Sequence, residues 1–183
     1  MQRPQRKWSS GELRRLAAMA GTMPAAQVAA RLGRPLASVE HMARRQGLSL
    51  AYDRLPGEGR CSECGLIRFT LDRSGRCAPC RHSARLDAIR ARMAEVHREL
   101  PPERRGVYAA TEAACGRSRM DPAPARPDTS GMGPRAAARA EREWLRECEL
   151  VEASNIRRRM RAAERRLERM EKSCREGKTG GNA

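Results

Sequence analysis

Four cysteines form two closely spaced pairs, Cys61-x2-Cys64 and Cys77-x2-Cys80, separated by twelve residues. Each pair can offer two thiolates to one tetrahedral ion, and the loop between the pairs can bring them together. We therefore expect one Zn²⁺ ion bound by Cys61, Cys64, Cys77 and Cys80. A redox dithiol pair or an iron–sulfur centre is the alternative. Because four protein ligands leave no coordination position for water, this zinc would be structural.

The residues around these cysteines predict the elements that position them. Gly65 suits a tight turn after Cys64, residues 66–71 have the composition of a strand, and residues 72–75 suit a hairpin turn. A helix is expected to start at the second cysteine pair. This order of turn, hairpin and helix resembles a treble-clef zinc finger. With few apolar residues nearby, metal binding would supply most of the folding free energy, on the order of 10 kcal/mol.

Composition points to an anionic partner. The 183 residues include 38 Lys and Arg against 22 Asp and Glu, a formal charge of +16, and aromatic residues make up 3%. So few aromatic side chains argue against one large core, and we expect several small domains. Arginine provides nearly all the positive charge, and its guanidinium pairs with phosphates and guanine edges in two-point contacts. A GC-rich genome would also favour arginine over lysine, but it does not explain the net charge.

The sequence argues against several classes of protein. No stretch reaches the roughly 18–20 apolar residues of a membrane span, and the N-terminus lacks the apolar run of a signal peptide. We expect an intracellular protein. No phosphate-binding glycine loop or catalytic cluster is evident, so we expect neither an enzyme nor a small-molecule substrate.

Residues 1–50 have the pattern of three short helices. Ser9 and Glu12 form a capping box at the first helix, whereas Gly33 and Gly47 suit the ends of the second and third. Apolar residues recur at helical spacing, which predicts a shared core of Leu13, Leu16, Ala17, Ala20, Val28, Ala29, Leu32, Leu36, Val39, Met42 and Ala43. Short helices joined by a glycine-containing turn are typical of a helix-turn-helix.

If the third helix buries its apolar side, its other side can enter a DNA major groove. We expect Ser38 and His41 to contact base edges, and Arg44 and Arg45 to contact guanine or phosphate. Arg34, just before this helix, would contact a phosphate. An N-terminal arm would follow the backbone or minor groove, with Arg3, Arg6 and Lys7 as its basic residues. The alternative is a solvated helix face that binds nothing.

The same segment resembles the Myb/SANT-like helix-turn-helix of small bacterial and phage DNA-binding proteins. The resemblance covers residues 6–50 and rests on Trp8-Ser9, Glu12-Leu13, the run from Ala29 to Arg34, Val39 and Gly47-Leu48. Pro35 departs from the pattern, which usually has Ser or Thr there. The resemblance implies a three-helix fold that binds double-stranded DNA, in a protein of the bacterial cytoplasm or nucleoid, encoded by a phage or mobile element.

The remainder of the chain is predicted to be helical, which makes the fold class mainly α. After a linker at 51–60, the zinc finger and its extended helix span 61–100, and a Pro-rich segment with a short helix spans 101–133. A long amphipathic helix is expected at 134–176, followed by a disordered tail at 177–183. Its apolar positions follow 4-3-4-3-4 spacing, at Ile156, Met160, Ala163, Leu167, Met170 and Cys174. This spacing favours a coiled coil that joins copies of the chain, or a helix docked on a partner.

These features together predict a DNA-binding transcriptional regulator with a structural zinc finger and a self-associating C-terminal helix. A DNA-packaging adaptor similar to a terminase small subunit would combine the same elements but form larger rings. A third hypothesis is an interaction module that binds another protein, such as a polymerase or a host complex.

Overall fold

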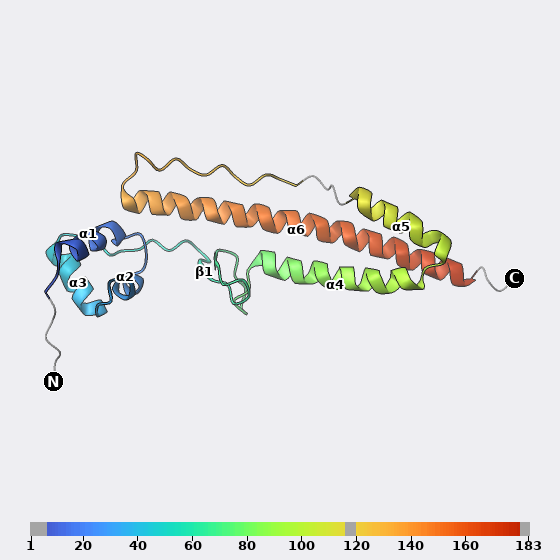
Figure 1. Ribbon diagram of the computed structural model, residues 1–183, viewed down its shortest axis with the longest axis horizontal. Coiled ribbons are helices and arrows are strands. Elements are labelled where there is room, and N and C mark those ends of the chain that lie inside the picture. Colours follow the sequence, from blue (N-terminus) through green and yellow to red (C-terminus); the bar gives the residue numbers. More distant parts are fainter. Residues whose placement is uncertain (1–6, 116–119, 180–183) are drawn as a thin grey trace, which may run out of the picture. The chain divides into compact units, whose positions relative to one another are not determined.

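The computed structural model describes residues 7–115 and 120–179 and is mainly helical (Figure 1). Two compact units are distinguished. Unit 1 consists of Met1–Pro56 and Ala125–Leu145, and unit 2 of Gly57–Pro124 and Arg146–Ala183. The predicted DNA-contact residues Arg3 and Arg6 lie outside the described residues, as do residues 180–183 of the predicted tail.

Unit 1 contains the three expected helices, α1 (Ser10–Met19), α2 (Ala25–Leu32) and α3 (Leu36–Arg45). Their shared core consists of fully or nearly fully buried apolar side chains, namely Leu16, Val28, Ala29, Leu32, Val39 and Ala43. Two predicted core positions are wrong, and two more, Leu13 and Ala20, are half-buried and lie outside this core. Leu36 is 40% exposed because it is the first residue of α3, and Ala17 is exposed while Met19 packs on the core.

Local sequence signals explain where these helices begin and end. The Ser9 side chain accepts a hydrogen bond from the Glu12 amide and the Glu12 carboxylate accepts one from the Ser9 amide, which confirms the capping box. Gly47 has φ +64°, and the Leu48 amide donates to the carbonyl of Ala43 over 2.9 Å. This is the Schellman arrangement that glycine favours because it lacks a Cβ.

Part of the predicted linker at 51–60 is fixed within unit 1. Arg142, near the start of the long helix α6 (Pro134–Thr179), donates to the carbonyls of Thr22 and Asp53 and lies 4.4 Å from the Tyr52 ring centroid. Arg135 forms a 2.6 Å ion pair with Asp53. Residues 52 and 53 are therefore held by α6.

Unit 2 begins with a two-stranded antiparallel hairpin, in which β1 (Gly59–Arg60) pairs with β2 (Ile67–Arg68). The strand predicted at 66–71 is thus only two residues long, and its partner precedes the first cysteine. The turn predicted at 72–75 is present, with the Gly75 amide donating to the Asp72 carbonyl. It closes the loop before α4 (Ala78–Glu99).

Helices α4 and α6 lie side by side and run in the same direction (Figure 1). Ion pairs show the direction, because Arg85 pairs with Glu164 and Arg92 with Glu171. The predicted apolar positions of α6 and apolar residues of α4 form one core: Leu86, Met93, Val96, Leu100, Met160, Ala163, Met170 and Cys174, with Ile89, Ile156 and Leu167 packed against it.

A short helix, α5 (Pro102–Cys115), follows α4 and packs against α6. The Tyr108 hydroxyl donates to the carbonyl of Arg169, and Arg104 donates to Ser173. Helix α6 extends to Thr179, so residues 177–179 of the predicted disordered tail are helical. Among the described residues, no helix combines the length and apolarity needed to cross a membrane.

Candidate metal centre and candidate nucleic-acid interface

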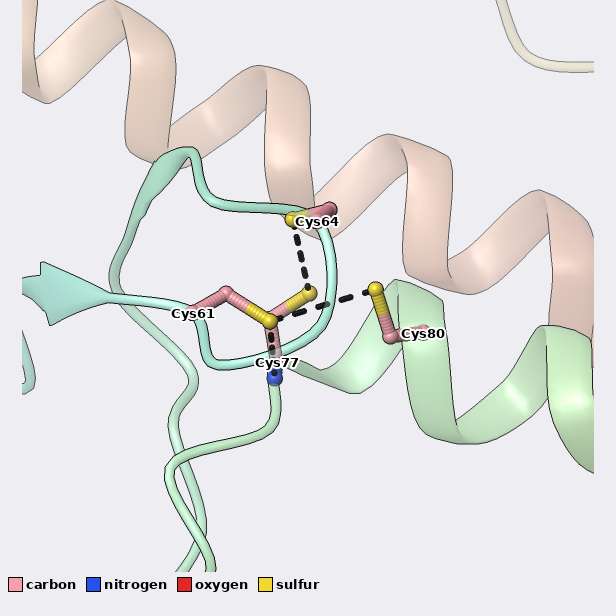
Figure 2. Close-up of side chains that lie close together, drawn as sticks. All are labelled: Cys61, Cys64, Cys77 and Cys80. Atoms are coloured by element: carbon pink, nitrogen blue, oxygen red, sulfur yellow. Dashed lines mark hydrogen bonds between the residues drawn. The ribbon is translucent and has the colours of Figure 1, made fainter.

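The four predicted cysteines converge (Figure 2). Cys61 follows β1, Cys64 ends the tight turn after it, and Cys77 and Cys80 lie at the N-cap and first turn of α4. Their Sγ atoms all lie within 4.8 Å of one another; Cys61 and Cys80 are 3.9 Å apart, and Cys64 and Cys77 are 4.0 Å apart. Tetrahedral zinc with bonds of about 2.3 Å requires sulfur separations of about 3.8 Å. The cluster therefore has the size of a four-thiolate metal site.

Backbone hydrogen bonds pin the two cysteine-bearing loops to each other. The Cys61 amide donates to the Leu66 carbonyl over 2.9 Å, and the Gly65 amide donates to the Cys61 carbonyl over 3.0 Å. Gly65 has φ +69°, which closes this turn without strain. The Ser62 amide donates to the Gly75 carbonyl over 3.0 Å, which ties the first loop to the second.

Backbone amides also point at the sulfurs. Hydrogen bonds from the amides of Cys64, Cys77 and Glu63 lower the pKa of Cys61 to about 6, although burial opposes them. A backbone hydrogen bond from Leu66 lowers the pKa of Cys64, whereas burial raises the pKa of Cys77 and Cys80. The cluster thus stabilises negative charge on one pair of sulfurs and would need a cation to carry it on all four.

A buried carboxylate on α6 anchors the hairpin. Glu149 is 1% exposed and accepts hydrogen bonds from the Phe69 amide, over 2.6 Å, and from the Thr70 hydroxyl. Thr70 in turn accepts from the amide of Ala78, the first residue of α4. Nearby, Arg68 forms a 2.7 Å ion pair with Glu152. Sequence reasoning missed this anchor because the partners lie about eighty residues apart and share no local motif.

His82, two residues after Cys80, is not part of the cysteine cluster. Its Nε2 atom lies 3.5 Å from the Arg157 guanidinium, and burial together with Arg157, Arg81 and Arg85 lowers its pKa. Among the described residues, Cys61, Cys64, Cys77 and Cys80 are the group with metal-binding geometry.

In unit 1, the outward side of α3 borders an open hollow of about 640 Å³. Four of the predicted DNA-contact residues line it together: Lys7, Ser38, His41 and Arg45. Trp8, Leu13 and Gln46 also line it, although the sequence analysis did not select Gln46. Arg44 is exposed but does not line the hollow.

Arg34 has a different environment from the one expected. Its side chain is 7% exposed and bonds to Glu12, Nε to Oε1 and Nη2 to Oε2, both over 3.1 Å. The same guanidinium lies 4.3 Å from the Trp8 ring centroid and donates to the Lys7 carbonyl. Arg34 therefore links the turn between α2 and α3 to α1 and to residues 7 and 8.

Three further arginines of unit 1 are exposed on α1 and α2, namely Arg14, Arg15 and Arg31. No ion pair with them is found among the described residues. The only sequence signal for them was the local excess of positive charge.

No protein-family model, curated protein or solved structure matches the chain.

Proposed function

We propose that the chain is a double-stranded-DNA-binding protein whose helix α3 enters the major groove. The observation that carries this proposal is the hollow on α3, where Lys7, Ser38, His41 and Arg45 meet on one exposed surface. These side chains supply hydrogen-bond donors, and Ser38 also an acceptor, of the kind used to contact base edges and phosphates. A ten-residue helix, about 15 Å long, is of suitable size for the groove.

The proposal revises the list of DNA contacts. Arg34 is left out because its guanidinium is committed to Glu12 and Trp8. Arg44 is kept as a phosphate contact, since it is exposed beside the hollow. In this proposal unit 1 is a Myb/SANT-like helix-turn-helix, in agreement with the resemblance of residues 6–50.

The metal in the four-cysteine cluster is proposed to be zinc, in a treble-clef-like finger. Thiolates favour zinc among available divalent ions, and the sulfur separations of 3.9 and 4.0 Å are close to those of a tetrahedral zinc site. Its role would be to fold residues 59–80 and to seat them on Glu149.

Among DNA-binding functions we favour a transcriptional regulator over a packaging adaptor. Both hypotheses drew on an apolar face of α6 free to join copies of the chain, but that face, from Ile156 to Cys174, packs against α4 of the same chain. Self-association through it therefore supports neither hypothesis. We favour the regulator because the side chains on α3 are suited to contacting base edges, whereas a packaging adaptor needs only a loose sequence preference.

Fluorescence anisotropy of the zinc-loaded chain on fluorescent duplexes tests the proposal. The wild type should bind, and log Kobs should fall linearly with log salt, by roughly 0.9 for each phosphate neutralised. A duplex pool enriched by binding should then be preferred to random duplexes. Arg45→Ala should weaken binding to the enriched site by about 1–3 kcal/mol, or about 5- to 150-fold.

Arg159→Ala is the matched control, because Arg159 is also an exposed helical arginine but lies on unit 2. It should leave the preference for the enriched site unchanged. Failure of the wild type to bind any duplex at low salt, or equal effects of the two variants on site preference, would contradict the proposal.

A further inference from the structure

Helix α6 carries a second basic surface, which the proposed function does not use. Five basic residues follow 3-4-4-3 spacing along it: Arg158, Arg161, Arg165, Arg169 and Lys172. Each lies two residues from a member of the apolar face that packs on α4. Two residues correspond to about 200° around a helix, so the five form a basic face opposite the apolar one. It is about 21 Å long.

The basic face is exposed and its central residues are not neutralised. Arg161, Arg165 and Arg169 are exposed, and the described residues include no ion pair with any of them. Arg158 pairs with Asp121, and Lys172 pairs with Glu176 over 3.8 Å; both keep about half or more of their side chain exposed.

The positions of the acidic residues in this helix segment explain why the basic face carries an excess of positive charge. Glu164 and Glu171 point to the flank of α6 that meets α4, where they pair with Arg85 and Arg92. Glu168 stands exposed at the edge of the basic face. Packing against α4 therefore draws negative charge away from Arg161, Arg165 and Arg169.

We infer that this basic face of α6 binds the phosphate backbone of double-stranded DNA without reading its sequence. Guanidinium groups form two-point contacts with phosphate, and three neighbouring arginines on one helix face can neutralise several phosphates. A membrane surface fits less well, because a helix bound there needs an apolar face free to enter the lipid, and α4 covers that face of α6. The inference rests on the proposed function for the identity of the nucleic acid.

The test compares two triple variants of the zinc-loaded full chain on a random-sequence duplex. One variant changes the basic face, Arg161→Gln with Arg165→Gln and Arg169→Gln. The control removes the same charge from ion-paired exposed arginines away from the basic face, Arg90→Gln with Arg126→Gln and Arg139→Gln. Glutamine has nearly the helix propensity of arginine, and circular dichroism should show both variants folded.

The basic-face variant should lower the magnitude of the slope of log Kobs against log salt by about 2 to 3, near 0.9 for each lost phosphate contact. The control should lower it by less than about 1. Equal changes in the two variants would overturn the inference. A second outcome would also overturn it: the wild type binds phosphatidylserine vesicles or an acidic protein, and the basic-face variant loses that binding. In that outcome the salt slope for DNA binding is the same in the variant as in the wild type.

The outcome of this test can be distinguished from the outcome of the test of the proposed function. Arg45→Ala should remove preference for an enriched site and leave most of the salt dependence, whereas the basic-face variant should do the reverse. A wild type with no site preference but a slope that depends on Arg161, Arg165 and Arg169 would refute groove reading by α3 and support this inference.

Discussion

Replacing Arg34 by methionine should destabilise unit 1 strongly, and the reason lies in Glu12. The Glu12 residue is 3% exposed, and its carboxylate is satisfied by Ser9 and by two bonds from Arg34. Methionine fills part of the space of the arginine stem but cannot donate a hydrogen bond. Arg34→Met would therefore leave a buried negative charge without its cation.

Removing one partner of a buried ion pair costs about 3–5 kcal/mol. The lost contact between Arg34 and the Trp8 ring adds about 0.5–1 kcal/mol. The three-helix segment, residues 7–56 of unit 1, has a total stability of only about 5 kcal/mol at roughly 0.1 kcal/mol per residue. The single substitution should therefore leave unit 1 marginally folded or unfolded.

Urea unfolding followed by tryptophan fluorescence measures this effect, because Trp8 and Trp144 both belong to unit 1. Arg45→Met is the control, since Arg45 is exposed and its loss should change the unfolding free energy by less than about 0.5 kcal/mol. Adding Glu12→Gln to Arg34→Met should restore part of the loss, because the buried charge is then gone. If Arg34→Met costs under about 1 kcal/mol but weakens DNA binding, Arg34 is a phosphate contact and the structural reasoning is refuted.

Three further predictions concern unit 2. The chain should bind one zinc ion, measured by atomic absorption. Cys64→Ser should release this ion and make residues 59–80 sensitive to protease. Cys148→Ser, outside the cluster, should retain the metal. Glu149→Ala should lower the unfolding free energy by about 1–3 kcal/mol, because the Phe69 amide is left buried without an acceptor, and hydrogen exchange at that amide should accelerate. Gly57→Ala should destabilise more than Gly65→Ala in urea unfolding: both glycines have positive φ, but only at Gly57 would a Cβ overlap the Phe69 carbonyl oxygen. Retained zinc in Cys64→Ser, unchanged Phe69 exchange, or equal costs at the two glycines would contradict the respective prediction.

The parts of the fold that local chemistry determines were predictable from the sequence. The Ser9 and Glu12 capping box and the turns at Gly33 and Gly47 are signals within a few residues, and each appears where expected. The four-cysteine cluster was predictable for a similar reason, because the spacing within each pair and the loop length together constrain the sulfur positions.

Contacts between distant residues were not predictable in this way. A sequence displays the charge of Arg34 but not its partner, and an arginine beside a predicted recognition helix suggests a phosphate as readily as it suggests Glu12. Glu149 offered no signal, since nothing in an amphipathic helix distinguishes a carboxylate that will be buried under a hairpin. The hairpin itself was misplaced because two-residue strands are too short to show alternation.

The partner of the α6 apolar face was present in the sequence as a second pattern. Leu86, Met93 and Leu100 repeat every seven residues, as do Ile156, Ala163 and Met170, so each helix offers an apolar face of the same period. What spacing leaves open is whether the partner helix belongs to the same chain. A covalent connection makes pairing with α4 an intramolecular event, which favours α4 over a second copy. Parallel helices of one chain also require a connection that returns along their length. Helix α5 begins this return, antiparallel to α6, with Arg104 bonded to Ser173 and Tyr108 to Arg169, and Asp121 bonds to Asn155 further along it.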